Sequence, residues 1–147
     1  MKKLSSKIII AIIIIVIAAV AIGVSQKHLF GTAQKGNKTV TVTVEDQVNN
    51  KVLVKNEVYH TNATTLEAFL TENKEALKVN ITSTKYGPYL MGLEGLNTPS
   101  MVKGPWWMYG FTSKTPDKTY TIGNAPGVKD VILGKESTVT FVYTDKM

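Results

Sequence analysis

The feature that most constrains this chain is an alternation of polar and apolar residues at two places far apart in the sequence, strict at the first. Thr39–Val44 reads Thr-Val-Thr-Val-Thr-Val, and Thr138–Tyr143 reads Thr-Val-Thr-Phe-Val-Tyr. Successive side chains of a strand point to opposite faces, so such a pattern buries one face and leaves the other polar. β-Branched residues also favour extended backbone. Both segments are therefore predicted to be half-buried strands.

One hairpin and one helix are predicted after the first of these strands. Residues 47–50 supply turn chemistry, and Lys51–Tyr59 reads as the returning strand. Thr64 and Glu67 then have the spacing of a capping box, with Thr64 as the predicted N-cap. Apolar side chains follow on one helical stripe, at Leu66, Phe69, Leu70 and Leu77. An amphipathic helix that packs on a sheet is expected.

Several more strands are predicted after the helix. They are expected at Val79–Thr84, Tyr89–Leu93, Trp106–Thr112 and Thr138–Tyr143, with a short edge piece at Thr119–Ile122. Two strands, one helix and then three or more strands are typical of an α+β domain. We expect a β-grasp-like sheet with one packed helix, in ββαβββ order, over residues 38–147.

The segment before this domain is predicted to enter a membrane. Residues 1–7 contain three lysines, residues 8–24 form an unbroken apolar run, and residues 25–37 are polar and read as a tether. A helix of that length spans roughly 25 Å, which is near the lower limit for a bilayer. An uncleaved anchor is preferred and a cleaved signal segment stays open. Because the lysines favour a cytoplasmic N-terminus, we expect a single-pass protein of the cell membrane with an extracellular C-terminal domain, or a secreted one after cleavage.

The composition excludes several functional classes. The chain has no cysteine, so disulfides and zinc–thiolate sites are impossible. All its basic residues are lysines, and the absence of arginine argues against nucleic acid as a partner. It contains no nucleophile elbow, phosphate-binding glycine loop or zinc-protease motif. His28 and His60 lie in the tether and at a strand end, so no catalytic residue, metal site or required cofactor is predicted.

The candidate binding residues lie in an aromatic and glycine-rich stretch from Lys85 to Phe111. Neighbours on a strand face opposite ways, so Trp106 and Trp107 cannot both enter one core. One interpretation places Trp107, Tyr109 and Phe111 in the core, with Trp106 covering a sheet edge. The functional interpretation is a shallow apolar platform that binds a small ligand, with Trp106 as the preferred contact. The candidate ligand-binding residues are Tyr86, Tyr89, Asn97, Trp106, Trp107 and Tyr109.

The order of these motifs resembles that of a known family. The matching segments are Thr65–Leu70 at the helix start, Tyr86-Gly87-Pro88-Tyr89, Gly95, Trp106-Trp107 with Tyr109, Gly127-Val128 with Asp130, and Gly134 before Val139-Thr140-Phe141. Together they resemble the C-terminal domain of transcobalamin and intrinsic factor and the bacterial surface-protein domain related to it. The resemblance implies a β-rich extracellular module that closes over one face of a corrinoid such as cobalamin.

Two departures from the family shape the functional expectation. Transcobalamins hold the corrinoid between this module and a helical barrel, which has no counterpart in this sequence. Bacterial relatives often have an acidic turn where this chain has Leu133-Gly134-Lys135-Glu136. We therefore expect a module that captures or caps a small ligand, by resemblance a corrinoid, together with a partner transport or surface protein. The alternative is a structural or adhesive surface module whose lysines meet anionic wall polymer and which has no small-molecule ligand.

Overall fold

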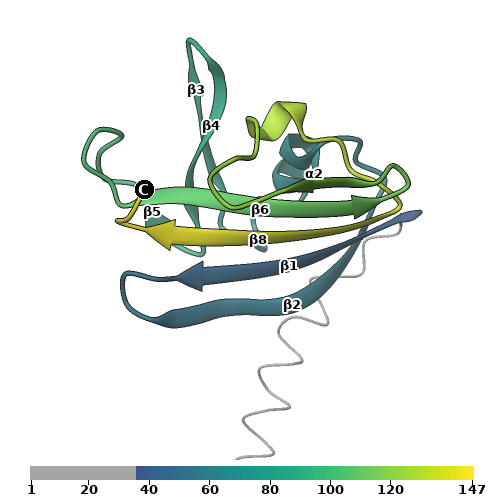
Figure 1. The fold of residues 1–147 in the computed structure, drawn as a ribbon, viewed down its shortest axis with the longest axis horizontal. Coiled ribbons are helices and arrows are strands. Elements are labelled where there is room, and N and C mark those ends of the chain that lie inside the picture. The colour runs from purple at the N-terminus through teal and green to yellow at the C-terminus, as the bar shows by residue number, and fades with distance from the viewer. Residues whose placement is uncertain (1–35) are drawn as a thin grey trace, which may run out of the picture. The chain divides into compact units, whose positions relative to one another are not determined.

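The computed structural model describes residues 36–147. The predicted n-region 1–7, apolar segment 8–24 and nearly all of the tether 25–37 lie outside the described residues. The elements (Figure 1) are β1 (Lys38–Asp46), β2 (Lys51–Thr61), α2 (Leu66–Glu72), β3 (Asn80–Thr84), β4 (Gly87–Leu93), β5 (Leu96–Asn97), β6 (Trp106–Lys114), β7 (Lys118–Tyr120), the 3-10 helix η1 (Val128–Asp130) and β8 (Glu136–Thr144). Within residues 36–147, no helix has the length and apolarity needed to cross a bilayer.

The two alternating segments become neighbours at the centre of a five-stranded sheet. Its order is β2-β1-β8-β6-β7, in which β1 and β8 run parallel and every other pair is antiparallel. Thr41 lies opposite Thr138 and Val42 opposite Val139, so the polar and apolar faces of the two strands are in register. Val42 and Val139 are completely buried. Both predicted strands are confirmed, and β1 is half-buried as expected, but β8 is buried on both faces from Phe141 to Thr144.

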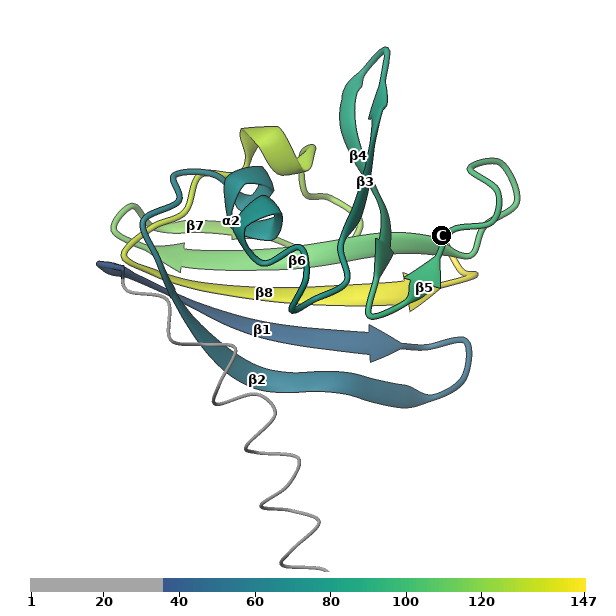
Figure 2. The same cartoon turned by 180° about the vertical axis from the view of Figure 1, so that it is seen from behind.

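Helix α2 lies over one face of this sheet (Figure 2) and buries Leu66, Phe69 and Leu70. Its N-cap is Thr65, whose hydroxyl accepts a hydrogen bond from the Ala68 N–H at 3.1 Å. The predicted Thr64 cap is wrong by one residue, because the Thr64 carbonyl instead accepts a bond from the Leu133 N–H at 2.9 Å.

The helix is also shorter than its apolar stripe predicts. The Asn73 side-chain amide donates to the Phe69 carbonyl at 2.9 Å, and the Asn73 N–H bonds to the same oxygen. Asn73 is the C-cap, and its φ of −102° and ψ of 21° depart from helical values, so the helix ends at Glu72. Leu77 is buried as expected but lies beyond the helix.

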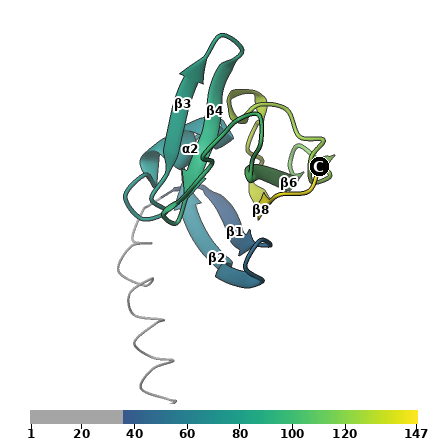
Figure 3. The ribbon, with the colours of Figure 1, turned by 90° about the vertical axis from the view of Figure 1, so that its left-hand side faces the viewer.

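A second sheet of three strands, in the order β3-β4-β5, rises beside the helix (Figure 3). The α+β class with a single packed α-helix is confirmed for the described residues. The strands after the helix do not all join one sheet, however, as the expected ββαβββ order required. Glu94 and Gly95 have positive φ angles of 53° and 83°, so the chain turns back and β5 pairs with β4.

Both sheets contribute to one hydrophobic core within residues 36–147. Phe141 on β8 packs against Tyr109 on β6, with ring centroids 5.8 Å apart, and Leu90 and Leu93 on β4 join the same cluster. Gln34–Met147 is accordingly a compact unit. We treat it as an independently folding domain because it carries its own core and both sheets.

Candidate functional site

Strand β6 places its aromatic side chains on alternating faces. Trp107, Tyr109 and Phe111 are buried in the core, with exposed fractions of 5%, 9% and 2%. Trp106 and Met108, which alternate with them, are half-buried. The interpretation in which Trp107 rather than Trp106 enters the core is therefore confirmed.

Trp106 supports the loop that precedes its strand. Its indole Nε1 donates to the Met101 carbonyl at 2.9 Å, across five residues of that loop. The ring also lies against Gly104, where an added methyl group would come within 2.6 Å of a ring carbon. Gly104 has a φ of 67°, which glycine adopts without strain. In this structure Trp106 therefore holds the 98–105 loop in shape.

A cleft of about 370 Å³ opens beside the first half of β6, and Trp106 is not among its lining residues. Three parts of the chain form it: the outer half of the β3–β4 hairpin, the start of β6, and the segment that leads into η1. These parts can be followed in Figure 3. The lining residues are Thr84, Tyr86, Gly87, Pro88, Tyr89, Leu90, Trp107, Met108, Tyr109, Gly123, Ala125, Pro126, Gly127 and Val128.

The deep side of the cleft presents ring faces and few free polar groups. Trp107 Nε1 donates to the Leu96 carbonyl at 2.9 Å, and the Tyr109 hydroxyl donates to the Pro126 carbonyl. Burial raises the pKa of Tyr109 above its ordinary value, and the negative charge of Asp130 raises it further. Tyr109 therefore stays neutral and hydrogen-bonded to protein, so a ligand would meet its apolar ring.

The mouth of the cleft is shaped by the tip of the β3–β4 hairpin. Thr84 fixes the turn, because its hydroxyl accepts from the Tyr86 N–H at 3.1 Å and donates to the Gly87 carbonyl at 2.8 Å. Tyr86 stands at the tip with 82% of its surface exposed, and the Lys85 ammonium lies 4.9 Å from its ring centroid. Tyr89 is half-buried further down the strand, and burial raises its pKa.

A lysine from η1 reaches the same hairpin tip. A methyl group built on Gly87 would lie 3.2 Å from both Cε and Nζ of Lys129. The Lys129 side chain therefore passes directly over Gly87, whose φ of 111° is also unsuited to any larger residue. The fold thus brings two lysines, Lys85 and Lys129, to the mouth of an aromatic cleft.

Four of the six predicted binding residues line this cleft, namely Tyr86, Tyr89, Trp107 and Tyr109. Asn97 and Trp106 do not. The Asn97 side-chain oxygen accepts a bond from Asn80 Nδ2 at 3.0 Å, and its backbone carbonyl accepts one from the Tyr143 hydroxyl at 2.8 Å. Asn97 thus joins β3, β5 and β8 rather than facing the cleft.

Sequence reasoning did not single out Thr84, Lys129 or the 123–127 segment as parts of a site. Gly127 and Val128 carry part of the family resemblance but are not among the predicted binding residues. Lys129 has no local signal, because its place at the cleft comes from the packing of η1 near β4. Of the residues at the mouth of the cleft, only those of the Tyr86-Gly87 turn could be proposed from the sequence.

Comparison with known proteins shows the fold alone. No family model matches the chain, and no curated protein matches it. A crystal structure from Ruminococcus gnavus, described as that of "a putative metal binding protein", is similar with a TM-score of 0.54 and 17% sequence identity. The match covers 75% of this chain and 99% of that one. In residues 36–147 of this chain, no three His, Cys, Asp or Glu side chains gather where a metal ion could be held.

Proposed function

We propose that this protein is a membrane-tethered, extracellular ligand-binding module with a β-grasp-like, transcobalamin-like domain. In this proposal it captures or caps one face of a small planar ligand, by resemblance a corrinoid, and a partner transport or surface protein supplies the rest of the site. The strand order with a parallel central pair and one helix on the sheet supports the β-grasp assignment. We do not extend metal binding from the Ruminococcus gnavus protein to this chain.

The observation that carries the proposal is the cleft lined by Tyr86, Tyr89, Trp107 and Tyr109. Ligand sites are concave and mostly apolar, with a few placed polar groups, and usually measure about 300–1,000 Å³. This cleft has that chemistry and lies near the lower end of that range. A macrocycle larger than the cleft would contact it with one side only, which leaves the other side for a partner.

The two tryptophans allow a direct test with a built-in control. They are the only ones in the chain, so the Trp106→Phe variant of the Gln34–Met147 unit reports on Trp107 in the cleft wall. Trp107→Phe leaves only Trp106, which lies outside the cleft. Cobalamin and cobinamide would each be titrated into both variants, with free N-acetyltryptophanamide as the correction for light absorption by the ligand.

We expect a saturable change in emission for Trp106→Phe and a much smaller one for Trp107→Phe. Calorimetry of the wild-type unit would give the affinity independently of fluorescence. Constant emission and no heat up to high micromolar corrinoid would refute unassisted corrinoid binding. An equal response from both variants would place the ligand outside the cleft.

A further inference from the structure

We infer that the ligand of this cleft carries a negatively charged group, a carboxylate, sulfonate or phosphate, which Lys129 binds at the hairpin tip while a planar apolar body lies along the aromatic wall. This inference rests on the proposed function and adds the charge of the ligand and the orientation in which it sits. It depends on three features of the cleft.

The first feature is the position of the Lys129 ammonium. The side chain lies over Gly87, itself a lining residue, and 3.2 Å separates Nζ from the place of a methyl group there. Lysine commonly packs its methylene stem on protein and leaves the ammonium to solvent or ligand. Because Gly87 has no side chain, the Lys129 stem can lie close to the backbone of the hairpin, and its charge is placed at the mouth.

The second feature is the charge balance around the mouth. None of the lining residues is acidic. Lys85, one residue before Tyr86, adds a second positive charge that lies over the Tyr86 ring. Within the described part of the chain, neither Lys85 nor Lys129 forms a salt bridge with a carboxylate. Both ammonium groups are therefore available to an anion.

One acidic residue, Asp130, follows Lys129 directly in η1. Asp130 Oδ2 lies 3.9 Å from where a methyl group on Gly127 would be, and its charge acts on Tyr109. Asp130 thus lies near Gly127, in the segment that leads into η1, whereas the Lys129 ammonium lies at Gly87. The negative end of a ligand would be attracted to Lys129 at the hairpin tip and repelled by Asp130 near Gly127.

The third feature is the use of hydrogen-bonding groups along the wall. The Trp107 and Tyr109 donors are both bonded to backbone carbonyls, so the deep wall offers ring faces to a ligand. Uncommitted polar groups lie toward the mouth, where the lysines and the Tyr86 hydroxyl are. A charge-assisted bond to lysine is stronger than a neutral one. The charged end of the ligand would therefore sit at the mouth and the apolar end inside.

A matched pair of probes tests this orientation without any assumption about the natural ligand. 1-Anilinonaphthalene-8-sulfonate is anionic, and N-phenyl-1-naphthylamine has the same ring systems without the charge. We expect the wild-type Gln34–Met147 unit to bind the anionic probe about tenfold more tightly, as a hydrogen bond to a charged group would give. Lys129→Gln should abolish most of that preference and leave the neutral probe unaffected.

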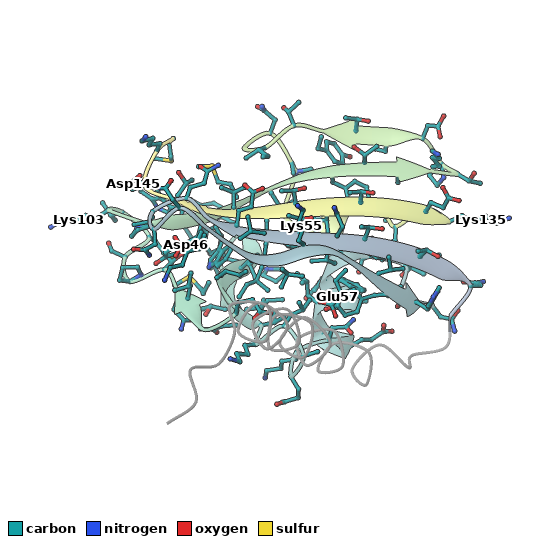
Figure 4. All side chains as sticks on the ribbon, turned by 90° about the horizontal axis from the view of Figure 1, so that it is seen from below. Asp46, Lys55, Glu57, Lys103, Lys135 and Asp145 are labelled. Carbon is teal, nitrogen blue, oxygen red and sulfur yellow. The ribbon has the colours of Figure 1, made fainter. Side chains whose placement is uncertain are left out.

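Two controls locate the effect. Lys135→Gln removes an exposed lysine from the end of the sheet opposite Lys103 (Figure 4), away from the cleft end of β6, and should change neither affinity. Tyr89→Ala removes part of the cleft wall and should weaken both probes. Added salt should weaken the anionic probe in the wild-type unit more than in Lys129→Gln.

The outcomes separate the two proposals. Equal affinities for the two probes, or a preference that survives in Lys129→Gln, would overturn the charge inference while ligand binding in the cleft stands. Affinities that do not change in Tyr89→Ala would show that the probes bind elsewhere, which also overturns it. If neither probe and no corrinoid binds, the proposed function fails as well.

Discussion

The two sheets of this domain differ in how deeply their residues are buried. In the five-stranded sheet, Val40, Val42, Val44, Val139 and Phe141 are all completely buried. In the three-stranded sheet, β3 has no buried residue, and only Leu90, Gly92 and Leu93 of β4 are buried. The larger sheet thus carries most of the stability of the domain. The smaller one, whose tip forms the cleft mouth, contributes less buried surface.

This difference separates the residues that stabilise the domain from those at the cleft mouth. Apolar burial contributes roughly 25 cal/mol per Å², and most of the completely buried side chains lie on β1, β8, β6 and α2. Tyr86, Lys85 and Lys129 are exposed and contribute little to that total. Substitution at the hairpin tip should therefore alter binding without unfolding the domain.

The largest expected effect is on the five-stranded sheet. Phe141→Ala should lower the free energy of unfolding by about 3–5 kcal/mol, because it removes a fully buried ring and leaves a cavity. Tyr89→Ala, at a half-buried position of β4, should cost only about 1 kcal/mol. Urea unfolding followed by circular dichroism measures both. Equal losses would contradict the division between the two sheets.

A smaller effect is expected where the larger sheet borders the cleft. The raised pKa of Tyr109 means that the unfolded chain ionises this tyrosine near pH 10 while the folded domain keeps it protonated. The contribution of Tyr109 to the free energy of unfolding is therefore fully present below pH 10 and declines as the pH rises above that value. Tyr109→Phe should lower stability at pH 7 by about 1 kcal/mol, through loss of the bond to Pro126.

The same variant should also lose stability less steeply than the wild type between pH 10 and about pH 12. Urea titrations at pH 7, 10 and 11 test this. If the free energy of unfolding of Tyr109→Phe falls with pH as steeply as that of the wild type, Tyr109 ionises in the folded domain as it does in the unfolded chain.

The smallest effect is expected at the hairpin tip. Thr84→Val keeps the shape of the side chain but removes its bonds to the Tyr86 N–H and the Gly87 carbonyl. Global stability should fall by only about 0.5 kcal/mol, whereas hydrogen exchange at Tyr86 and Gly87 should accelerate. Thr82→Val, at an exposed position of the same strand, is the control. Unchanged exchange in Thr84→Val would mean that the turn does not depend on this hydroxyl.

The larger sheet was largely predictable because its signals are local. Alternation in Thr39–Val44 and Thr138–Tyr143 predicted two strands, and for the first also its buried face. The same rule showed that Trp106 and Trp107 face opposite ways. Alternation does not tell which face of β6 borders the cleft. The prediction preferred Trp106 as the ligand contact, whereas the structure has Trp107 in the cleft lining and Trp106 outside it.

The remainder of the candidate site depends on contacts between segments that are distant in sequence. Lys129 meets Gly87, and Tyr109 meets Pro126, only after η1 and its leading segment have packed. No local sequence pattern predicts these two contacts. The helix end was also mispredicted, although for a local reason: α2 ends at its C-cap Asn73, while the last apolar residue of the stripe, Leu77, is buried beyond the helix.

The parallel pairing of β1 with β8 has a consequence for biosynthesis. These strands come from the two ends of the described domain, yet they form the middle of its main sheet. The first hairpin must therefore wait for the last strand to emerge before the sheet can close, which gives the domain a high contact order and slow folding. A nascent chain that lacks only β8 would leave β1 and β6 without their shared neighbour, open to proteolysis and to pairing with other chains.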